Sequence, residues 1–405
     1  MKKESQKEKV LLLENIHIDA INEFKKNGFE VISQKGAMSE EDLLKIIGEI
    51  SVLGIRSKTH ITKKVLAEAK NLKAIGAFCI GTNQIDLKEA ASKGVAVFNA
   101  PYSNTRSVVE LVIGEIIMLL RKIPDANKDM HNGIWNKLSQ NCFEVRGKKL
   151  GIIGYGNIGT QLSVVAEALG MKTAFYDKNE KLSLGNTKKI NSLTELLKWA
   201  DIVTLHVDGR KENTNFFGEK EFAQMKENSY FLNLSRGHVV DIKALKKYLK
   251  NGKILGAAVD VYPAEPEKNG PGFETELQGL ENVILTPHIG GSTEEAQKSI
   301  GEFVTGKILN YLENGNTVLS VNLPGVALVS KEKKVTRIIH IHENVPKMLA
   351  QINNILGEKN INIAAQQLKT NENIGLVVTD VEGKVPDFVY ISLQNIPNTI
   401  TCKII

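Results

Sequence analysis

One stretch decides the fold of this chain: Lys149-Leu150-Gly151-Ile152-Ile153-Gly154-Tyr155-Gly156-Asn157-Ile158-Gly159-Thr160. It reads as a short buried strand that runs into glycines and then into a helix. Gly154, Gly156 and Gly159 have the G-x-G-x-x-G spacing, in which the first glycine permits a tight turn, the second lets a pyrophosphate approach the backbone, and the third lets the helix pack against the sheet. The free N–H groups at the start of such a helix attract phosphate.

The residues after this stretch favour a dinucleotide over other phosphates. Thr173-Ala174-Phe175-Tyr176-Asp177 predicts the next strand, which ends in an acid. Asp177 can bind the ribose hydroxyls of adenosine and would repel a 2′-phosphate, so NAD is expected rather than NADP. The alternative is a plain βαβ turn with a solvated Asp177.

Length and composition bound the remaining possibilities. A chain of 405 residues predicts two to three domains, and 42% hydrophobic with 24% charged residues is ordinary for a globular protein. The net charge of +6 comes without a long Lys/Arg block, so no nucleic-acid partner is expected. The apolar run 108–120 is too short to span a bilayer, and the cysteines lack metal-ligand spacing. We expect a cytoplasmic protein without metal or membrane partner.

The first part of the chain alternates strand and helix patterns. Strands are predicted at 10–13, 52–55, 72–75 and 95–98, and a helix at 18–26. This pattern is typical of an open, doubly wound parallel sheet of the flavodoxin-like kind, whose ligand face lies at the carboxyl ends of the strands. We assign residues 1–106 and 299–325 to this substrate-binding domain, with a return helix at 295–313.

The glycine-rich stretch belongs to an inserted domain, residues 107–298. It opens with an apolar helix at 107–121. Six parallel strands are predicted near 150–153, 173–176, 202–206, 230–234, 255–259 and 283–286. This is the strand number of a Rossmann-type NAD-binding domain.

The predicted order of helices and strands changes near the end of the chain. Residues 326–334 read as a linker that contains the charged run Lys331-Glu332-Lys333-Lys334. Residues 335–405 then predict strands at 335–341, 361–368, 374–381 and 400–404, with helices at 345–356 and 388–393. The order βαββαβ is ferredoxin-like and predicts a small third domain.

Three polar sites follow strands of the inserted domain. Arg236 lies in the segment 233–237, Asp260 and Glu265 follow the run 257–259, and His288 lies in the segment 287–291. Hydride transfer to a nicotinamide needs a base for the hydroxyl proton, and His288 titrates near neutral pH. Glu265 would orient its ring, and Arg236 offers a planar fork for a carboxylate. Each residue alone has a structural explanation, but the three together in this order favour catalysis.

Several longer motifs show a family resemblance. They are Gly76-Ala77-Phe78-Cys79-Ile80-Gly81-Thr82-Asn83-Gln84, Phe98-Asn99-Ala100-Pro101-Tyr102-Ser103-Asn104-Thr105-Arg106-Ser107-Val108, residues 151–159, Ser235-Arg236-Gly237, and Leu285-Thr286-Pro287-His288-Ile289-Gly290-Gly291-Ser292-Thr293. With them the chain resembles, nearly end to end, the D-isomer-specific 2-hydroxyacid dehydrogenase family, and within it the short bacterial members with a C-terminal ACT domain.

The resemblance implies NAD-dependent oxidation of 3-phospho-D-glycerate to 3-phosphooxypyruvate, the first step of L-serine biosynthesis. It also implies a side activity, the reduction of 2-oxoglutarate to 2-hydroxyglutarate. It implies Arg236, Glu265 and His288 as the catalytic set. The cofactor residues that it implies are Gly154, Gly156, Asn157, Ile158, Gly159, Asp177, Leu234, Ser235, Arg236, Asp260, His288, Gly290 and Gly291.

For the substrate, the resemblance implies Arg56, Ser57, Lys58 and Asn104, and adds Lys137 from a neighbouring subunit. Close relatives carry Arg where this chain has Lys58. A lysine neutralises phosphate but cannot bind it bidentately. The alternative for Lys58 and for Lys137 is a solvated surface lysine.

The tail resembles an amino-acid-sensing ACT domain. The resemblance places L-serine, an allosteric inhibitor, at His342, Asn344 and Asn362 between paired domains of a homotetramer. On the residues alone, caps and turns are the favoured explanation of these positions. Two other functions stay open: an NAD-sensing, corepressor-like interaction protein, and a dehydrogenase for another D-2-hydroxy acid.

Overall fold

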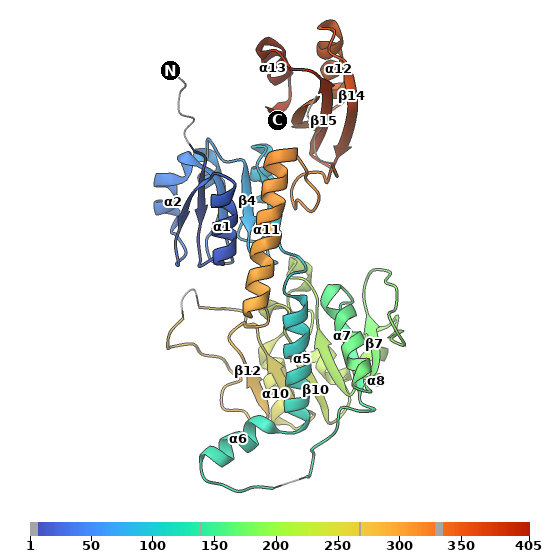
Figure 1. Cartoon of the computed structure of the whole chain (residues 1–405). Helices are drawn as coiled ribbons and strands as arrows, with labels where there is room; N and C mark the ends of the chain where they lie inside the picture. Colours follow the sequence, from blue (N-terminus) through green and yellow to red (C-terminus); the bar gives the residue numbers. More distant parts are fainter. Residues whose placement is uncertain (1–6, 138, 267–268, 329–334) are drawn as a thin grey trace. The chain divides into compact units, whose positions relative to one another are not determined.

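The computed structural model describes residues 7–137, 139–266, 269–328 and 335–405 (Figure 1). The chain divides into two compact units, which we call unit 1 (residues 1–103 and 297–405) and unit 2 (residues 104–296). Unit 2 contains the glycine-rich stretch. Unit 1 contains a second parallel sheet and, at the C-terminus, an antiparallel sheet, so the expected fold class is confirmed.

Unit 2 is built on a parallel sheet with the strand order β12-β11-β10-β9-β6-β7-β8. The strands are β6 (Lys149–Ile153), β7 (Lys172–Tyr176), β8 (Lys188–Lys189), β9 (Ile202–Leu205), β10 (Ser229–Asn233), β11 (Ile254–Val259) and β12 (Val283–Leu285). The order reverses between β6 and β9, and such a switch point is where dinucleotides bind. The expectation of six strands was wrong by one, because β8 has only two residues and gives no periodic signal.

Helices cover both faces of this sheet, as alternate residues of β6 show. Ile152 packs in a core with the helices α5 (Thr105–Leu120) and α7 (Asn157–Ala168). Ile153 packs in a second core on the opposite face. The helices of that face are α8 (Leu193–Trp199), α9 (Glu219–Gln224) and α10 (Ile242–Lys250). Unit 2 also holds α6 (Ile123–His131) and two 3-10 turns, Lys211–Asn213 and Gly237–Val239.

The first sheet of unit 1 is parallel, with the order β2-β1-β3-β4-β5. Its elements are β1 (Lys9–Leu12), α1 (Ile18–Lys26), β2 (Glu30–Ser33), α2 (Glu40–Ile46), a 3-10 turn (Ile47–Glu49), β3 (Ile50–Ile55), α3 (Lys63–Glu68), β4 (Ala74–Ala77), α4 (Leu87–Ser92) and β5 (Ala96–Asn99). β4 begins two residues later than predicted, because the amide of Leu72 still donates to the Ala69 carbonyl in the turn that ends α3.

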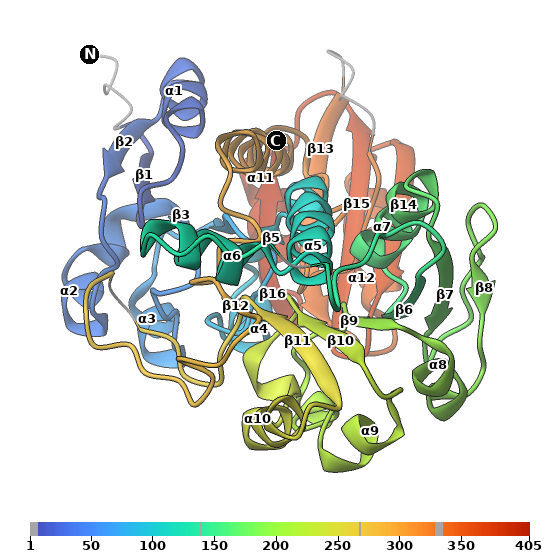
Figure 2. The same cartoon turned by 90° about the horizontal axis from the view of Figure 1, so that it is seen from below.

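The C-terminal sheet is antiparallel, with the order β14-β15-β13-β16 (Figure 2). Its elements are β13 (Val335–Glu343), α12 (Met348–Glu358), β14 (Ile363–Thr370), β15 (Ile374–Glu382), α13 (Asp387–Gln394) and β16 (Thr399–Ile404), so the βαββαβ order is confirmed. α12 begins three residues later than predicted. Lys347, just before it, has a left-handed backbone (φ +72°) that no helix turn tolerates.

Unit 1 is joined internally by the long helix α11 (Glu294–Asn314), which begins at the end of unit 2. Ile308 and Tyr311 of this helix share one core with Phe98 of the first sheet and with Ile339 and Leu376 of the C-terminal sheet. The predicted linker 326–334 lies largely outside the described residues, and its charged run 331–334 does so entirely. Among the described residues no helix is long and apolar enough to cross a membrane.

Candidate active site

Three strand ends of unit 2 position the predicted catalytic residues. β10 leads to Arg236, β11 to Glu265 and β12 to His288. The loop after β10 is fixed by the buried side chain of Asn233, which accepts hydrogen bonds from the amide and hydroxyl of Ser235 and donates one to the carbonyl of Arg236. The side chain of Arg236 itself is half-buried, and its guanidinium donates to the Ser235 carbonyl.

His288 and Glu265 form a hydrogen-bonded pair, with 2.7 Å between Nδ1 and Oε2. The second carboxylate oxygen of Glu265 accepts from the Tyr262 amide at 3.0 Å, so the carboxylate is held from both sides. The hydrogen bond to Glu265 raises the pKa of His288, although partial desolvation of the ring acts to lower it. Burial acts to raise the pKa of Glu265, but the bonds from His288 and Tyr262 outweigh it and lower that pKa. The other ring nitrogen of His288, Nε2, has no hydrogen-bond partner among the described residues, and the side chain is about half exposed.

The turn that contains His288 is stabilised by hydrogen bonds to Asp260. This buried carboxylate accepts from the hydroxyl of Thr286 at 2.6 Å and from the amides of Ile289 and Gly290 at 2.8 and 2.9 Å. His288 has a left-handed backbone (φ +53°), an unfavourable conformation that these three bonds maintain. Burial raises the pKa of Asp260 although the three hydrogen bonds act to lower it.

The loops of Arg236 and Glu265 are in direct contact. A Cβ atom added at Gly237 would lie 1.9 Å from the carbonyl carbon of Tyr262. Only a glycine therefore allows the loop after β10 to pass the loop after β11 this closely. The contact brings Arg236 near enough for its charge to act on both members of the His288–Glu265 pair.

The glycine-rich turn fits a dinucleotide. Gly154 has a left-handed backbone (φ +92°), and a Cβ at Gly159 would lie 2.3 Å from the Gly154 carbonyl oxygen. A Cβ at Gly156 would meet only open space, so this glycine leaves room beside the backbone. α7 begins at Asn157, followed by Ile158, and no side chain caps its first N–H groups. These amides are therefore available to the cofactor phosphates.

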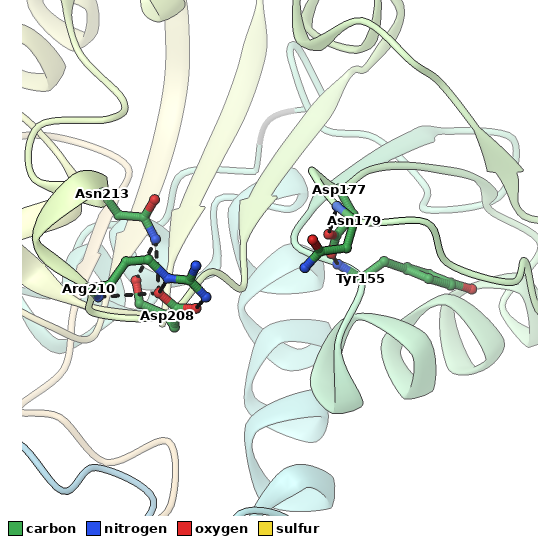
Figure 3. Close-up of polar contacts among 6 residues, drawn as sticks. All are labelled: Tyr155, Asp177, Asn179, Asp208, Arg210 and Asn213. Carbon is green, nitrogen blue, oxygen red and sulfur yellow. Dashed lines mark hydrogen bonds and ion pairs between the residues drawn. The ribbon is translucent and has the colours of Figure 1, made fainter. Parts of the chain in front are cut away.

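Asp177 lies at the end of β7, next to this turn (Figure 3). Its two carboxylate oxygens accept from the amides of Tyr155 and Asn179 at 2.8 and 2.9 Å. Each oxygen keeps a lone pair for a ribose hydroxyl. Figure 3 also shows a network after β9 that the sequence reasoning missed: Arg210 donates to Asp208 through Nε at 2.7 Å, and the amide of Asn213 donates to the Asp208 carbonyl.

Asn104 lies at the start of α5 and packs against the turn of His288. A Cβ at Gly291 would lie 2.4 Å from Asn104 Nδ2, so this glycine makes room for the amide. The oxygen of the Asn104 side chain is buried and has no partner among the described residues. A buried amide oxygen without a partner is costly, which makes it a fitting acceptor for a ligand.

A further buried carboxyl group was missed in the sequence. Glu115 of α5 is fully buried, and neither of its oxygens has a hydrogen-bond partner among the described residues. Burial, with the nearby charge of Asp260, raises the pKa of Glu115 to about 8. A pKa raised in this way favours the protonated form of Glu115 near neutral pH. In the sequence, Glu115 is visible only as a charged residue that interrupts the apolar run 108–120.

The other predicted site residues lie elsewhere. Arg56, Ser57 and Lys58 form the loop after β3 in unit 1. Lys137 is exposed after α6, beside Trp135, whose surface is 79% exposed. The remaining predicted cofactor residues, Leu234 and Ser235, are buried at the end of β10.

The residues predicted to bind L-serine lie in the C-terminal sheet and its turns. His342 is buried, its Nδ1 bonds to the Glu343 carbonyl, and its Nε2 has no partner among the described residues. Asn344 donates to the Asn371 carbonyl at 2.8 Å. Asn362 is exposed just before β14. The structure thus places one buried imidazole and two exposed amides at the ends of strands.

Comparison with known proteins identifies the class. Residues 113–290 match the family described as D-isomer specific 2-hydroxyacid dehydrogenase, NAD binding domain. A D-isomer specific 2-hydroxyacid dehydrogenase from Lactobacillus delbrueckii ssp. bulgaricus, solved in its NAD-complexed form, is 26% identical, with a TM-score of 0.68 over 78% of this chain and 100% of that one. The TT0316 protein from Thermus thermophilus is 28% identical, with a TM-score of 0.69 over 75% of this chain and 97% of that one.

The chain belongs to the D-isomer specific 2-hydroxyacid dehydrogenase family, and it is an oxidoreductase that uses NAD. Among its relatives, D-3-phosphoglycerate dehydrogenase of Dictyostelium discoideum is 49% identical over 98% of this chain and 97% of the relative. D-3-phosphoglycerate dehydrogenase of Escherichia coli K12 is 48% identical over 99% of this chain and 98% of the relative. The family expected from the motifs is therefore confirmed.

Proposed function

We propose that this chain oxidises 3-phospho-D-glycerate to 3-phosphooxypyruvate with NAD, the first step of L-serine biosynthesis. Its full-length relatives carry the name of this activity. The observation that carries the proposal is the His288–Glu265 pair, 2.7 Å apart, on a turn beside the loop of Arg236 and on the same sheet edge as the glycine-rich turn.

In this proposal each residue has one task. His288 takes the proton of the substrate hydroxyl at Nε2, while Glu265 holds the ring and stabilises the imidazolium that forms. Arg236 binds the carboxylate next to the reacting carbon, and its charge polarises the developing carbonyl. Bound NAD supplies the hydride acceptor. The uncapped N–H groups of α7 hold its phosphates, and Asp177 holds its adenosine ribose.

The test is a His288→Ala variant. It should slow the reduction of 3-phosphooxypyruvate (also called 3-phosphohydroxypyruvate) by NADH about 100-fold or more, because general acid–base contributions are typically of this size. NADH binding, followed by fluorescence, should persist. His131→Ala, at an exposed histidine of α6, is the matched control and should keep full turnover. Full turnover in His288→Ala would remove this residue from the proposed role.

We assign the phosphate of the substrate to Arg56, Ser57 and Lys58, and a further contact to Asn104. Neither Arg56 nor Lys58 has a charged partner among the described residues, so both cations are available. Comparing KM for 3-phosphohydroxypyruvate and for 2-oxoglutarate tests this assignment and the side activity together. A KM that is equal for the two acids would contradict it.

Residues 335–405 are proposed as an ACT regulatory domain that binds L-serine, and residues 1–106 with 299–325 as the substrate domain. The free Nε2 of the buried His342 supports a polar ligand near Asn344 and Asn362. Titration of L-serine into the assay should inhibit wild type, and Asn344→Ala should raise the inhibitory concentration. An unchanged rate up to millimolar serine would refute the regulation.

A homotetramer is part of this proposal, with Lys137 reaching a neighbouring subunit. The supporting surface is the exposed apolar cluster of Met130, Ile134 and Trp135. The apolar helix predicted at 107–121 does not add to this surface, because most apolar side chains of α5 are buried in the core of unit 2. Light scattering should give four chains of 44.6 kDa. The cytoplasmic location stays a prediction.

A further inference from the structure

We infer that Glu14 is a positioning residue for the phosphate of the substrate: it holds the loop of Arg56, Ser57 and Lys58 in the shape that presents two cations to an anion. The inference rests on the proposed function of that loop. Glu14 follows β1, in the same unit as the loop after β3, and its side chain is 8% exposed.

Two hydrogen bonds carry the inference. Oε2 of Glu14 accepts from the amide of Lys58 at 3.0 Å, and Oε1 accepts from the amide of Thr59 at 2.8 Å. Both oxygens of one buried carboxylate are thus aimed at successive backbone amides of the loop. Charge-assisted bonds of this kind are stronger than neutral ones, and an amide left without its acceptor in a buried place is costly.

Strained backbone accompanies these bonds. Glu14 and Asn15 both have left-handed backbones, with φ of +65° and +56°, which non-glycine residues rarely adopt. Their amides donate to the carbonyls of Gly36 and Gln34 at 3.1 and 3.3 Å, which fixes the turn. Such strain persists where the surroundings enforce it, and here it turns the carboxylate toward the loop.

The other end of the loop is held independently. At that end the side-chain amide of Gln84 donates to the carbonyl of Arg56. At the end that Glu14 holds, the hydroxyl of Thr59 also accepts from the amide of Met38 at 3.4 Å. Arg56, Ser57 and Lys58 are therefore clamped at both ends, while Ser57 and Lys58 remain exposed. The Lys58 and Thr59 amides are used by Glu14 and are not available to an anion, whereas the side chains of Arg56, Ser57 and Lys58 remain to bind it.

Charge gives Glu14 a second effect. Arg56 and Lys58 are two residues apart, and like charges this close repel each other. The Glu14 carboxylate, which accepts from the Lys58 and Thr59 amides, places a negative charge at the loop that carries these two cations. Replacing Glu14 by Gln keeps the size but removes the charge and turns one acceptor into a donor that faces an N–H group.

The experiment compares Glu14→Gln with Glu49→Gln, the same change at an exposed glutamate of unit 1 that pairs with Lys9. Steady-state reduction of 3-phosphohydroxypyruvate by NADH is measured. Glu14→Gln should raise KM for 3-phosphohydroxypyruvate about tenfold or more, with kcat within about twofold and KM for NADH unchanged. Glu49→Gln should match wild type in all three.

A merely structural role would lower the melting temperature and affect both substrates alike. Glu14→Asp keeps the charge but shortens the side chain by one methylene, so it should give a KM between those of wild type and Glu14→Gln. If Glu14→Gln does not fold, Glu14→Asp replaces it in the test. A wild-type KM in either folded variant would overturn this inference alone. A wild-type chain that fails to reduce 3-phosphohydroxypyruvate would overturn the proposed function as well.

Discussion

At the scale of single residues, the His288–Glu265 pair sets the pH dependence of the reaction. Oxidation needs the neutral imidazole, so kcat/KM should rise with pH through the raised pKa of His288. Reduction needs the imidazolium and should fall over the same range. The carboxylate that raises this pKa is Glu265, at 2.7 Å.

Glu265→Gln should therefore move the acid limb of the oxidation profile to lower pH, because the neutral amide no longer stabilises the imidazolium. Turnover at the optimum should fall as well, since the ring loses its partner. The measurement is kcat/KM against pH in the oxidation direction. Glu110→Gln, at an exposed glutamate of α5, should leave the limb in place. An unshifted limb in Glu265→Gln would contradict the pairing in solution.

Sequence reasoning found residues that follow clear apolar strand patterns, and it missed residues whose role depends on partners that only the packing brings near. Arg236, Glu265 and His288 each come after an apolar run, and parallel strands bring such positions to one edge. Glu115 lies within a helix, and its burial beside Asp260 depends on packing that no spacing encodes. Glu14 was missed for a similar reason, because its partners are more than 40 residues away.

At the scale of elements, the contact between β6 and α7 depends on Gly159. A Cβ there would lie 2.3 Å from the Gly154 carbonyl oxygen. Gly159→Ala should destabilise the protein by about 1–3 kcal/mol and weaken NADH binding, because α7 must move away from the turn. Thermal unfolding and NADH titration check both effects.

The control for this change is Gly114→Ala in α5, where an added Cβ meets nothing within 4 Å. There the better helix propensity of alanine should stabilise the protein by up to about 1 kcal/mol. Equal stability of the two variants would show that the turn and α7 are not in contact in solution.

The boundaries of helices and strands show which features the sequence pattern does not predict. The helix at 18–26 was predicted with the bounds that the structure has, since His17 and Asn27 cap it and its apolar side is regular. α12 was predicted three residues too long at its start, because the left-handed Lys347 has no signature in composition. β8 was missed because two residues carry no period.

At the scale of the whole molecule, one ion pair fixes the C-terminal sheet within unit 1. Arg337 is 2% exposed and pairs with Asp380 through two hydrogen bonds of 2.6 and 2.7 Å. The same guanidinium donates to the carbonyl of Asn314 at the end of α11. β13, β15 and α11 are thus connected by one side chain.

Asp380→Ala should destabilise the protein by about 3–5 kcal/mol, because it leaves the Arg337 charge buried without its carboxylate. Denaturant unfolding measures the loss. Glu144→Ala, which breaks an exposed pair with Arg146, should leave the unfolding midpoint nearly unchanged, because water screens such a pair. A loss in Asp380→Ala as small as that of the control would mean that water reaches Arg337.

The core shared by α11 and the C-terminal sheet has a practical consequence. Ile308 and Tyr311 pack in one core with Ile339 and Leu376. Truncating the chain before residue 335 would therefore expose an apolar surface to water. A shortened enzyme would then aggregate or unfold whether or not the removed part senses an amino acid. The role of the tail has to be judged from single substitutions in the intact chain, never from a deletion.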